Sequence, residues 1–429
     1  MRLIGSKNRS KTSNKAGATG LLNESEHVGA RAGMSDNGHT GARPNGGEDT
    51  PAVDLFASSP NAASSDETVV GHVLAPKTKK AGSPQITGED RPPVQGHDRF
   101  ATGEVAIVCS NYEFGRIHSV REFRRGSRQA PKVVLETAMG MVLIKRRQPG
   151  RATSAHIAFS HAIQHHLERR AFPLARLITG KSGQGAVTIE GFVYEAFEYI
   201  SGTRYDRTLP PTADAGRALA YFHRLLSDYD GPGTPVSGSY HNVHKIPEAL
   251  RTMPTRLGDP AIGPTAERLA SMYERAAARV RDTGIAGWPR QVIHADYHPG
   301  NLIYTDGLVR AVVDFDSARI GPRALDIANA AMQFSVTRTG LDPMAWPVAL
   351  DAERLATFLG AYDAVEGCIL SRAECKALPG LMVEALITEA TLPIATTGRF
   401  GQIEGSTFLR MVERKAAWML DSYDELIPM

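Results

Sequence analysis

Residues 291–316, QVIHADYHPGNLIYTDGLVRAVVDFD, contain the side chains whose types and spacing are best suited to chemistry. They hold an H-x-D-x-x-x-x-N pattern formed by His294, Asp296 and Asn301, and a carboxylate follows at Asp314. Carboxylate and carboxamide oxygens suit Mg²⁺, and a further acid can accept the proton of an attacking hydroxyl. The pattern predicts a metal-and-base site for phosphoryl transfer, with the spacing of a kinase catalytic loop and its metal-binding Asp.

A hairpin is expected to bring these groups together. The dipeptide Asp306-Gly307 suits a tight turn between apolar runs, and Asn301 and Asp314 lie about equally far from it along the chain. Antiparallel pairing would therefore place the carboxamide beside the carboxylate. The alternative is a surface hairpin with scattered polar residues.

Each polar residue of this stretch has an expected role. Asp296 is the candidate catalytic base, with a backbone-capping loop acid as the alternative, and Asn301 and Asp314 are the candidate Mg²⁺ ligands. Asp316 either adds a second carboxylate or points to solvent. Three further residues are expected not to react. His294 should support the loop from a buried strand end, His298 either supports the loop locally or is exposed to solvent, and Asp326 is a helix cap or loop brace.

Composition sets the broad class. The chain has 429 residues, 42% apolar and 22% charged, enough for one large or two medium soluble domains. Its net charge of +3 does not indicate nucleic acid or an anionic membrane as a partner. The three cysteines lack metal-ligand spacing, which favours a cytoplasmic protein. We expect no membrane-spanning run and no secretory signal.

Residues 1–98 differ from the rest of the chain. They are rich in Gly, Ser, Asn, Asp, Pro and Thr, with only short isolated apolar pieces. Such a segment buries too little apolar surface to offset chain entropy, so we predict a disordered region. The alternative is a tail that orders on a protein partner.

Residues 99–200 are expected to form a small sheet with one main helix. Alternating apolar runs separated by turn residues predict five antiparallel strands, and a short helix precedes them. Thr153 or Ser154 could cap the main helix. The predicted strands are 117–124, 131–137, 141–147, 186–189 and 192–197, and the predicted helices are 102–112 and 153–170.

Residues 201–429 are expected to be mainly helical. Ser371 and Glu374 form a capping-box pattern, and Pro379 should break any helix that runs through it. One helix is expected to begin after Pro211. Further helices are expected at about 246–253, 264–281, 325–334, 351–365, 381–392 and 407–423. Together these elements predict an α+β, bilobal, protein-kinase-like fold with an N-lobe (99–200) and a C-lobe (201–429). ATP is expected to bind in the crevice between the two lobes.

Other residues are expected to contact ATP. Lys145 lies in the third predicted strand, where a kinase-type lysine would reach the phosphates, with a solvated strand lysine as the alternative. The turn at Gly126-Ser127 could cover the phosphates with backbone N–H groups. The connector that holds Glu198 and Ile200 is placed to meet the adenine edge.

The sequence resembles the superfamily of aminoglycoside phosphotransferases, choline kinases and type II homoserine kinases over about residues 103–424. The most specific pieces are HADYHPGNLIY and VVDFDSARIGPRALDIA, and the segment NYEFGRIHSVREFRRGSRQAPKVVLETAMGMVLIKRR is similar to homoserine kinase-like members. The resemblance implies a protein-kinase-like fold and Mg·ATP-dependent phosphorylation of a small-molecule hydroxyl. It also implies Asp296 as base, Asn301 and Asp314 as metal ligands, and Lys145 as a phosphate contact.

One feature departs from the superfamily pattern. Members usually carry a Glu on the N-lobe helix to pair with the lysine, but here His156, Ser160 and His161 stand in that region and no acid appears before Glu168. The ion pair is either replaced or formed with an acid elsewhere. This departure motivates the alternative of a pseudokinase-like nucleotide-binding regulatory module.

The acceptor is expected to be small. Only residues 317–324 separate Asp316 from the next helix, too few for the peptide platform of a protein kinase. Glu384, Glu389 and Glu404 near the expected rim would suit an amine-bearing acceptor such as an amino alcohol, an amino acid like homoserine, or an amino sugar. The alternative is that these acids only make a helix surface soluble.

Overall fold

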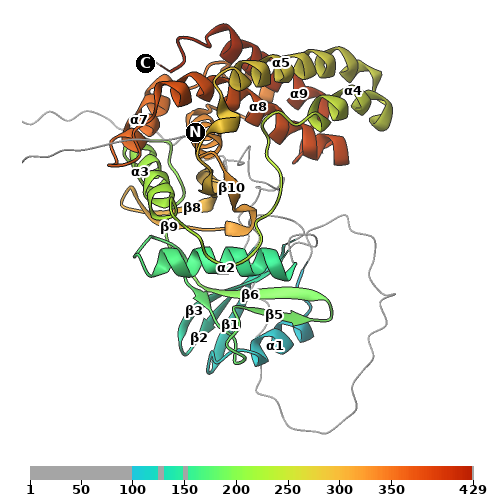
Figure 1. Cartoon of the computed structure of the whole chain (residues 1–429). Helices are drawn as coiled ribbons and strands as arrows, with labels where there is room; N and C mark the ends of the chain where they lie inside the picture. Colours follow the sequence, from blue (N-terminus) through green and yellow to red (C-terminus); the bar gives the residue numbers. More distant parts are fainter. Residues whose placement is uncertain (1–98, 124–129, 148–152, 428–429) are drawn as a thin grey trace, which may run out of the picture. The chain divides into compact units, whose positions relative to one another are not determined.

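The computed structural model describes residues 99–123, 130–147 and 153–427. The predicted disordered region 1–98 and the predicted phosphate-covering turn at Gly126-Ser127 lie outside the described residues. Within them, the chain forms a sheet-bearing part followed by a mainly helical part, which is the predicted α+β arrangement (Figure 1).

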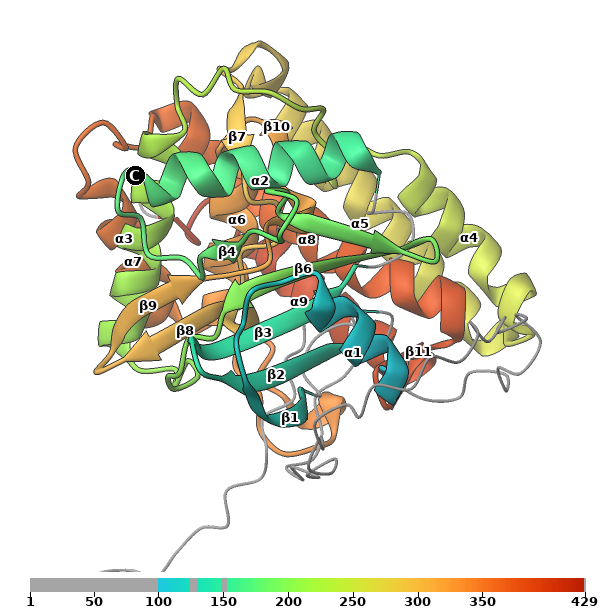
Figure 2. The same ribbon diagram turned by 90° about the horizontal axis from the view of Figure 1, so that it is seen from below.

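An antiparallel sheet forms the first part (Figure 2). Its strand order is β1-β2-β3-β6-β4, and β5 also pairs with β6. Alternating apolar residues explain the strands, because every second side chain enters the same face. The strands are β1 (Ile117–Phe123), β2 (Lys132–Thr137), β3 (Gly140–Arg146), β4 (Leu177–Ile178), β5 (Ala186–Ile189) and β6 (Phe192–Glu198).

The five predicted strands are confirmed, but the prediction of a five-stranded sheet is wrong. The sheet has a sixth strand, β4, of only two residues, which is too short to produce an alternation signal. It exists because Leu177 and Ile178 pair with Phe197 and Ala196 of β6.

Two helices accompany the sheet, α1 (Thr102–Ser110) and α2 (Ser154–Glu168). Thr153 caps α2, since its side chain accepts a hydrogen bond from the backbone N–H of His156. Residues of α1 share a small core with the sheet, whereas Phe159, Ile163 and Leu167 of α2 belong to the large core of the helical part. Helix α2 therefore joins the two parts, and it packs against both β4 and residues Phe315–Ser317.

The helical part contains three two-stranded antiparallel sheets within the described residues. Strand β7 (Gln291–Ile293) pairs with β10 (Arg319–Gly321), and β8 (Leu302–Thr305) pairs with β9 (Leu308–Val312). A third pair joins β11 (Arg399–Phe400) and β12 (Ile403–Glu404). The helices are α3 (Leu209–Leu225), α4 (Lys245–Leu257), α5 (Gly263–Arg281), α6 (Ala324–Ser335), α7 (Ala352–Asp363), α8 (Arg372–Thr397) and α9 (Gly405–Asp421).

Helix α8 confirms one expectation and contradicts another. It begins at the predicted capping box of Ser371 and Glu374, but it runs through Pro379, which was expected to break it. Tertiary contacts compensate, since the hydroxyl of Tyr423 donates to the carbonyl of Lys376 (3.2 Å) and a Cβ at Gly380 would meet Val280. Close packing on α5 and α9 thus outweighs the local cost of proline.

The same helix has the length and apolar composition that could cross a bilayer, so the expectation of no such run is wrong by these two criteria. However, 83% of its most apolar window is buried inside the protein, which is usual for a core helix. Among the described residues it is the single helix that meets both criteria.

Candidate functional site

The predicted hairpin is present and brings the proposed ligands together. In the β8–β9 pair Leu302 lies opposite Val312, and the N–H of Val313 donates to the carbonyl of Asn301 (3.0 Å). Asp314 therefore follows the hairpin immediately beside Asn301. Its backbone is left-handed (φ 67°), a conformation that is uncommon outside glycine and that clusters at functional sites.

The loop before the hairpin holds Asp296. The side-chain amide nitrogen of Asn301 donates to the backbone carbonyl of Asp296 (2.9 Å) and to its Oδ2 (3.2 Å). Both residues are buried. The amide nitrogen of Asn301 is thus used within the loop, and its Oδ1 is the end of the side chain that can meet a cation.

His298 supports the same loop, as predicted. Its Nδ1 accepts a hydrogen bond from the N–H of Gly300 (3.0 Å), and its Nε2 lies 3.7 Å from Oδ1 of Asp296. His294 is fully buried, and burial lowers its pKa, so its imidazole is neutral. Its Nε2 lies 3.3 Å from the carbonyl of Val313, which ties the loop to the hairpin. Both histidines therefore contact the loop or the hairpin beside it, and a structural role for them stays a prediction.

Asp326 braces the loop from helix α6. Its carboxylate accepts the backbone N–H groups of His294 (2.6 Å) and Ala295 (2.7 Å), and it contacts Nε2 of His223 (3.2 Å). The expected loop brace is therefore confirmed. The alternative of a helix cap is wrong, because the residue at the N-cap position of α6 is Arg323.

We expect Asp326→Ala to lower the free energy of unfolding by about 2–4 kcal/mol, because it leaves the buried N–H group of His294 and the partly buried N–H group of Ala295 without an acceptor. Urea unfolding measures the change. Asp228→Ala, which removes an exposed aspartate, is the control and should change stability by about 0.5 kcal/mol or less. Equal effects of the two substitutions would contradict the assignment of Asp326 as a brace.

Lys145 connects the sheet to the hairpin. Its Nζ lies 2.9 Å from Oδ1 of Asp314 and 2.7 Å from Oδ2 of Asp316. Burial works to lower the pKa of Lys145, but Asp314, Asp316 and Glu195 outweigh it and raise the pKa above its ordinary value. The lysine is therefore charged. Of the two alternatives for Asp316, the carboxylate faces the site rather than solvent.

A buried charge network lies behind Lys145. Arg147 places one guanidinium nitrogen 2.6 Å from Oδ1 of Asp316 and another 3.3 Å from Oε1 of Glu195. The same Oε1 lies 2.6 Å from Nε2 of His161 on α2. Burial opposes the charge of Glu195, but Arg147, His161 and Lys145 lower its pKa, so it is ionised.

The sequence analysis missed two charged residues near Lys145, namely Glu195 and Lys132. Glu195 is 1% exposed and lies opposite Lys145 in the β3–β6 pair. A charged residue in the middle of the apolar run FVYEAFE was the available signal, because a buried charge requires a partner. Lys132 lies opposite Lys145 in the β2–β3 pair, and burial together with Lys145 lowers its pKa although Asp314 opposes this.

Backbone hydrogen bonds at the end of β6 distinguish between the two predicted adenine contacts, Glu198 and Ile200. The N–H of Glu198 donates to the carbonyl of Arg176, and its carboxylate lies 2.7 Å from Nε of Arg176. The N–H of Tyr199 donates to the carbonyl of Met141. Of the predicted pair, Ile200 is thus the residue whose N–H is better placed to meet a base, and this contact stays a prediction.

One expected rim acid lies elsewhere. Glu384 is fully buried, where its carboxylate contacts Nδ1 of His241 (2.8 Å) and accepts the N–H of Asn242 (2.7 Å). Its inclusion in the acceptor rim is therefore wrong, because its position on α8 faces the core and fixes the loop before α4.

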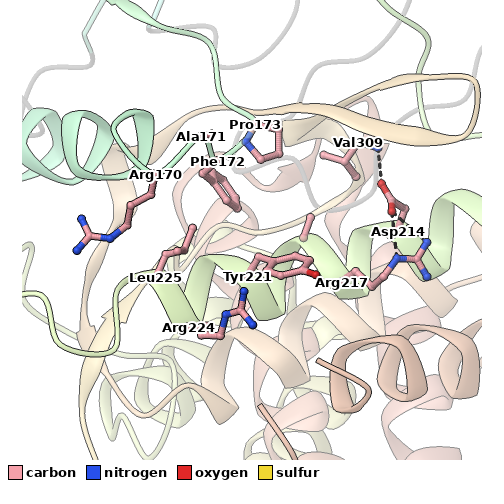
Figure 3. Close-up of a pocket in the computed structure, with 11 residues that line it drawn as sticks. Arg170, Ala171, Phe172, Pro173, Asp214, Arg217, Tyr221, Arg224, Leu225 and Val309 are labelled. Atoms are coloured by element: carbon pink, nitrogen blue, oxygen red, sulfur yellow. Dashed lines mark hydrogen bonds and ion pairs between the residues drawn. The ribbon is translucent and has the colours of Figure 1, made fainter. Parts of the chain in front are cut away.

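A separate hollow of about 360 Å³ lies against α3 and β9. Figure 3 shows Tyr221 and Leu225 below Phe172, with Asp214 paired to both Arg217 and the backbone of Val309. None of the predicted site residues lines it.

The donor set of the hairpin site suits a cation shared with phosphate. Among the residues that the structure describes, no group of three or more His, Cys, Asp or Glu side chains is arranged to hold a metal ion by itself. Asn301 and Asp314 would offer two oxygen ligands, within the one or two protein ligands that Mg²⁺ usually takes when phosphates supply others.

Comparison with known proteins decides the class. The model of the phosphotransferase enzyme family, APH, matches residues 119–372, more than half of the chain. The chain belongs to this family. The matched residues include Lys145, Asp296, Asn301 and Asp314, so the site lies inside the family region. Membership of a kinase family implies ATP and a divalent metal ion, and it confirms the predicted ATP-dependent phosphotransferase that acts on the hydroxyl group of a small molecule.

The relatives of this phosphotransferase agree with the class. A homoserine kinase of Methylocella silvestris is 23% identical over 286 residues, which cover 66% of this chain and 83% of that protein. The fold is shared with a microcompartment-associated aminopropanol kinase (TM-score 0.55, 15% identity, 75% and 98% coverage). It is also shared with the amicoumacin kinase hAmiN in complex with AMP-PNP, Ca²⁺ and Ami (TM-score 0.55, 14% identity, 75% and 94% coverage). These matches confirm the predicted fold and lend no support to the pseudokinase alternative.

Proposed function

We propose that this phosphotransferase moves the γ-phosphoryl group of Mg·ATP to the hydroxyl of a small amine-bearing acceptor, with homoserine as the leading candidate. The observation that carries the proposal is that Asn301 and Asp314 lie together at the hairpin, next to Asp296 of the preceding loop and Lys145 of the sheet. The named activity of the Methylocella silvestris relative supports an amino acid acceptor, and the aminopropanol kinase supports the wider amino alcohol class.

The residues fit a hard divalent cation. Asn301 offers its amide oxygen because its nitrogen is engaged by Asp296, and Asp314 already holds a cation, the Nζ of Lys145 at 2.9 Å. When bound to Asn301 and Asp314, Mg²⁺ would neutralise the phosphate charge of the nucleotide.

The chain's own groups then have defined tasks. Asp296 orients the acceptor hydroxyl and accepts its proton as the new O–P bond forms and the bond from the γ-phosphorus to ADP breaks. Lys145, held charged by its acidic neighbours, neutralises the donor phosphates. Asp326, His294 and His298 fix the loop, so that Asp296 keeps its orientation through the reaction.

The two parts of the chain divide this work. In our proposal residues 99–200 form an N-lobe that covers the nucleotide, with Ile200 at the adenine edge, and residues 201–429 form a C-lobe that binds the acceptor. Ion pairs between the two lobes support this division. Lys145 of β3 contacts Asp314 and Asp316, and Arg147, which follows β3, contacts Asp316.

A phosphorylation screen tests the proposal. Full-length protein is incubated with Mg·ATP and a panel of homoserine, amino alcohols, amino sugars and aminoglycosides, with ADP release and product mass as readouts, and with Asp296→Asn as the control. We expect one acceptor to yield a phosphomonoester with the wild type and not with the variant. No turnover with any acceptor, together with no thermal stabilisation by Mg·ATP, would overturn the proposal.

A further inference from the structure

We propose that Glu195 of β6 is the acid that holds Lys145 in its working position, in place of the glutamate that related kinases carry on the N-lobe helix. The inference rests on the proposed function, because it concerns the state in which metal and nucleotide occupy the site. It assigns a positioning role to a strand residue and to its helix partner, His161.

Lys145 shares a partner with the proposed metal. Its Nζ is bound to Asp314 and Asp316, and Asp314 is a proposed metal ligand. If both contacted the carboxylate of Asp314, the ammonium of Lys145 and the divalent cation would lie only a few ångströms apart. Their mutual repulsion would then oppose metal binding. Lys145 must therefore exchange at least its contact with Asp314 when the metal binds.

Glu195 is the acid best placed to become the new partner of Lys145. The first acid on helix α2, Glu168, lies at the last turn and is near Nδ1 of His165 (3.4 Å). Glu195 instead lies directly opposite Lys145 on the neighbouring strand, a placement that brings side chains within reach of each other. It already acts on Lys145 electrostatically.

The two oxygens of Glu195 have different surroundings. Oε1 contacts Arg147 and His161, whereas Oε2 is buried and has no hydrogen-bond partner within the described ranges 99–123, 130–147 and 153–427. A buried carboxylate oxygen without a partner is costly, and such an atom calls for a functional explanation. A shift of Nζ from Asp314 to Oε2 would satisfy it and leave Asp314 to the metal.

His161 links the helix to this acid. Its Nε2 lies 2.6 Å from Oε1 of Glu195, so α2 is attached to the acid rather than to the lysine. The ring fits because position 185 is glycine: a Cβ there would lie 2.8 Å from Nδ1 of His161. Helix α2 thus controls the lysine through a relay from His161 to Glu195.

The test is a Mg²⁺ titration in the presence of a non-hydrolysable ATP analogue. The increase in melting temperature reports nucleotide binding and gives the Mg²⁺ concentration at half-effect. In Glu195→Gln, Lys145 loses its alternative acid and competes with Mg²⁺ for Asp314, so the Mg²⁺ concentration at half-effect should rise about fivefold or more. Glu136→Gln, an exposed acid of β2, is the matched control and should leave the midpoint unchanged. A purely structural role would lower the melting temperature without moving this midpoint.

Two further variants complete the design. In a Lys145→Met background, Glu195→Gln should no longer shift the midpoint, because no lysine then competes for Asp314. The double variant His161→Glu/Glu195→Gln moves the acid to the helix and should bring the midpoint back to the wild-type range. A folded Glu195→Gln protein with the midpoint of the control, or a folded double variant without recovery, would overturn the inference.

The outcome separates the two proposals. If the wild type shows no Mg²⁺-dependent binding of the analogue, the proposed function fails. If the wild type binds and Glu195→Gln matches Glu136→Gln, only the role of Glu195 fails.

Discussion

Asp296→Asn is expected to lower kcat by about 10²–10⁴-fold, the range that general-base catalysis contributes. Asparagine has nearly the shape of aspartate and keeps an oxygen that can accept from the side-chain amide of Asn301, now 3.2 Å from Oδ2 of Asp296. It cannot accept the proton of the acceptor hydroxyl. Steady-state kinetics with the acceptor found in the screen measures the effect.

Nucleotide binding provides the internal control for this variant. Asp296 is not a proposed metal ligand, so the thermal stabilisation by Mg·ATP should stay within the range of the wild type. The unfolding midpoint in urea should also change little, because the loop keeps its brace at Asp326. A kcat within about threefold of the wild type would show that Asp296 is not the base.

The local parts of the structure were predictable from the sequence. Asp306-Gly307 determines the hairpin turn, and pairing outward from it brings Asn301 close to Asp314. A bulge between Ile303 and Tyr304, which the sequence did not reveal, shifts the register by one residue and sets the final placement. The Ser371–Glu374 capping box likewise marks the start of α8 correctly. Such features succeed because each depends on residues that are close in the chain.

Features that depend on distant partners were not predictable. Pro379 lies inside α8 because Tyr423, 44 positions further on, and the neighbouring helices support the helix there. Glu384 is a core residue because His241 and Asn242 satisfy its carboxylate from a loop that is 142 or 143 residues away. Hydrophobic periodicity carries no information on such pairs.

Glu195 shows how the same limit affects the site. A search for the partner of Lys145 along the helix finds only histidines and a serine before Glu168 in the last turn, since the acid opposite the lysine lies on a strand 50 residues further along the chain. Its partners Arg147 and His161 lie 48 and 34 residues before it. The three become neighbours only when β6 pairs with β3 and α2 packs beside them.

Asp314→Asn should reduce kcat/KM on the order of 10²–10³-fold, because it removes one charged ligand that stabilises the metal-bound phosphates in the transition state. Unlike Asp296→Asn, it should also raise the Mg²⁺ concentration required for half-maximal binding of an ATP analogue. In the metal-free protein Lys145 keeps Asp316, so the folded state retains an acid beside the lysine.

Asp306→Asn is a closely matched control for this change. Both aspartates flank the same strand, β9, both adopt left-handed backbone conformations (φ 52° and 67°), and asparagine tolerates that region about as well as aspartate. The backbone cost of the two substitutions should therefore cancel, and the difference between the variants isolates the carboxylate charge at the end of the hairpin. Equal Mg²⁺ midpoints and equal kcat/KM in the two variants would rule out Asp314 as a metal ligand, and with it the explanation of why Lys145 needs a second acid.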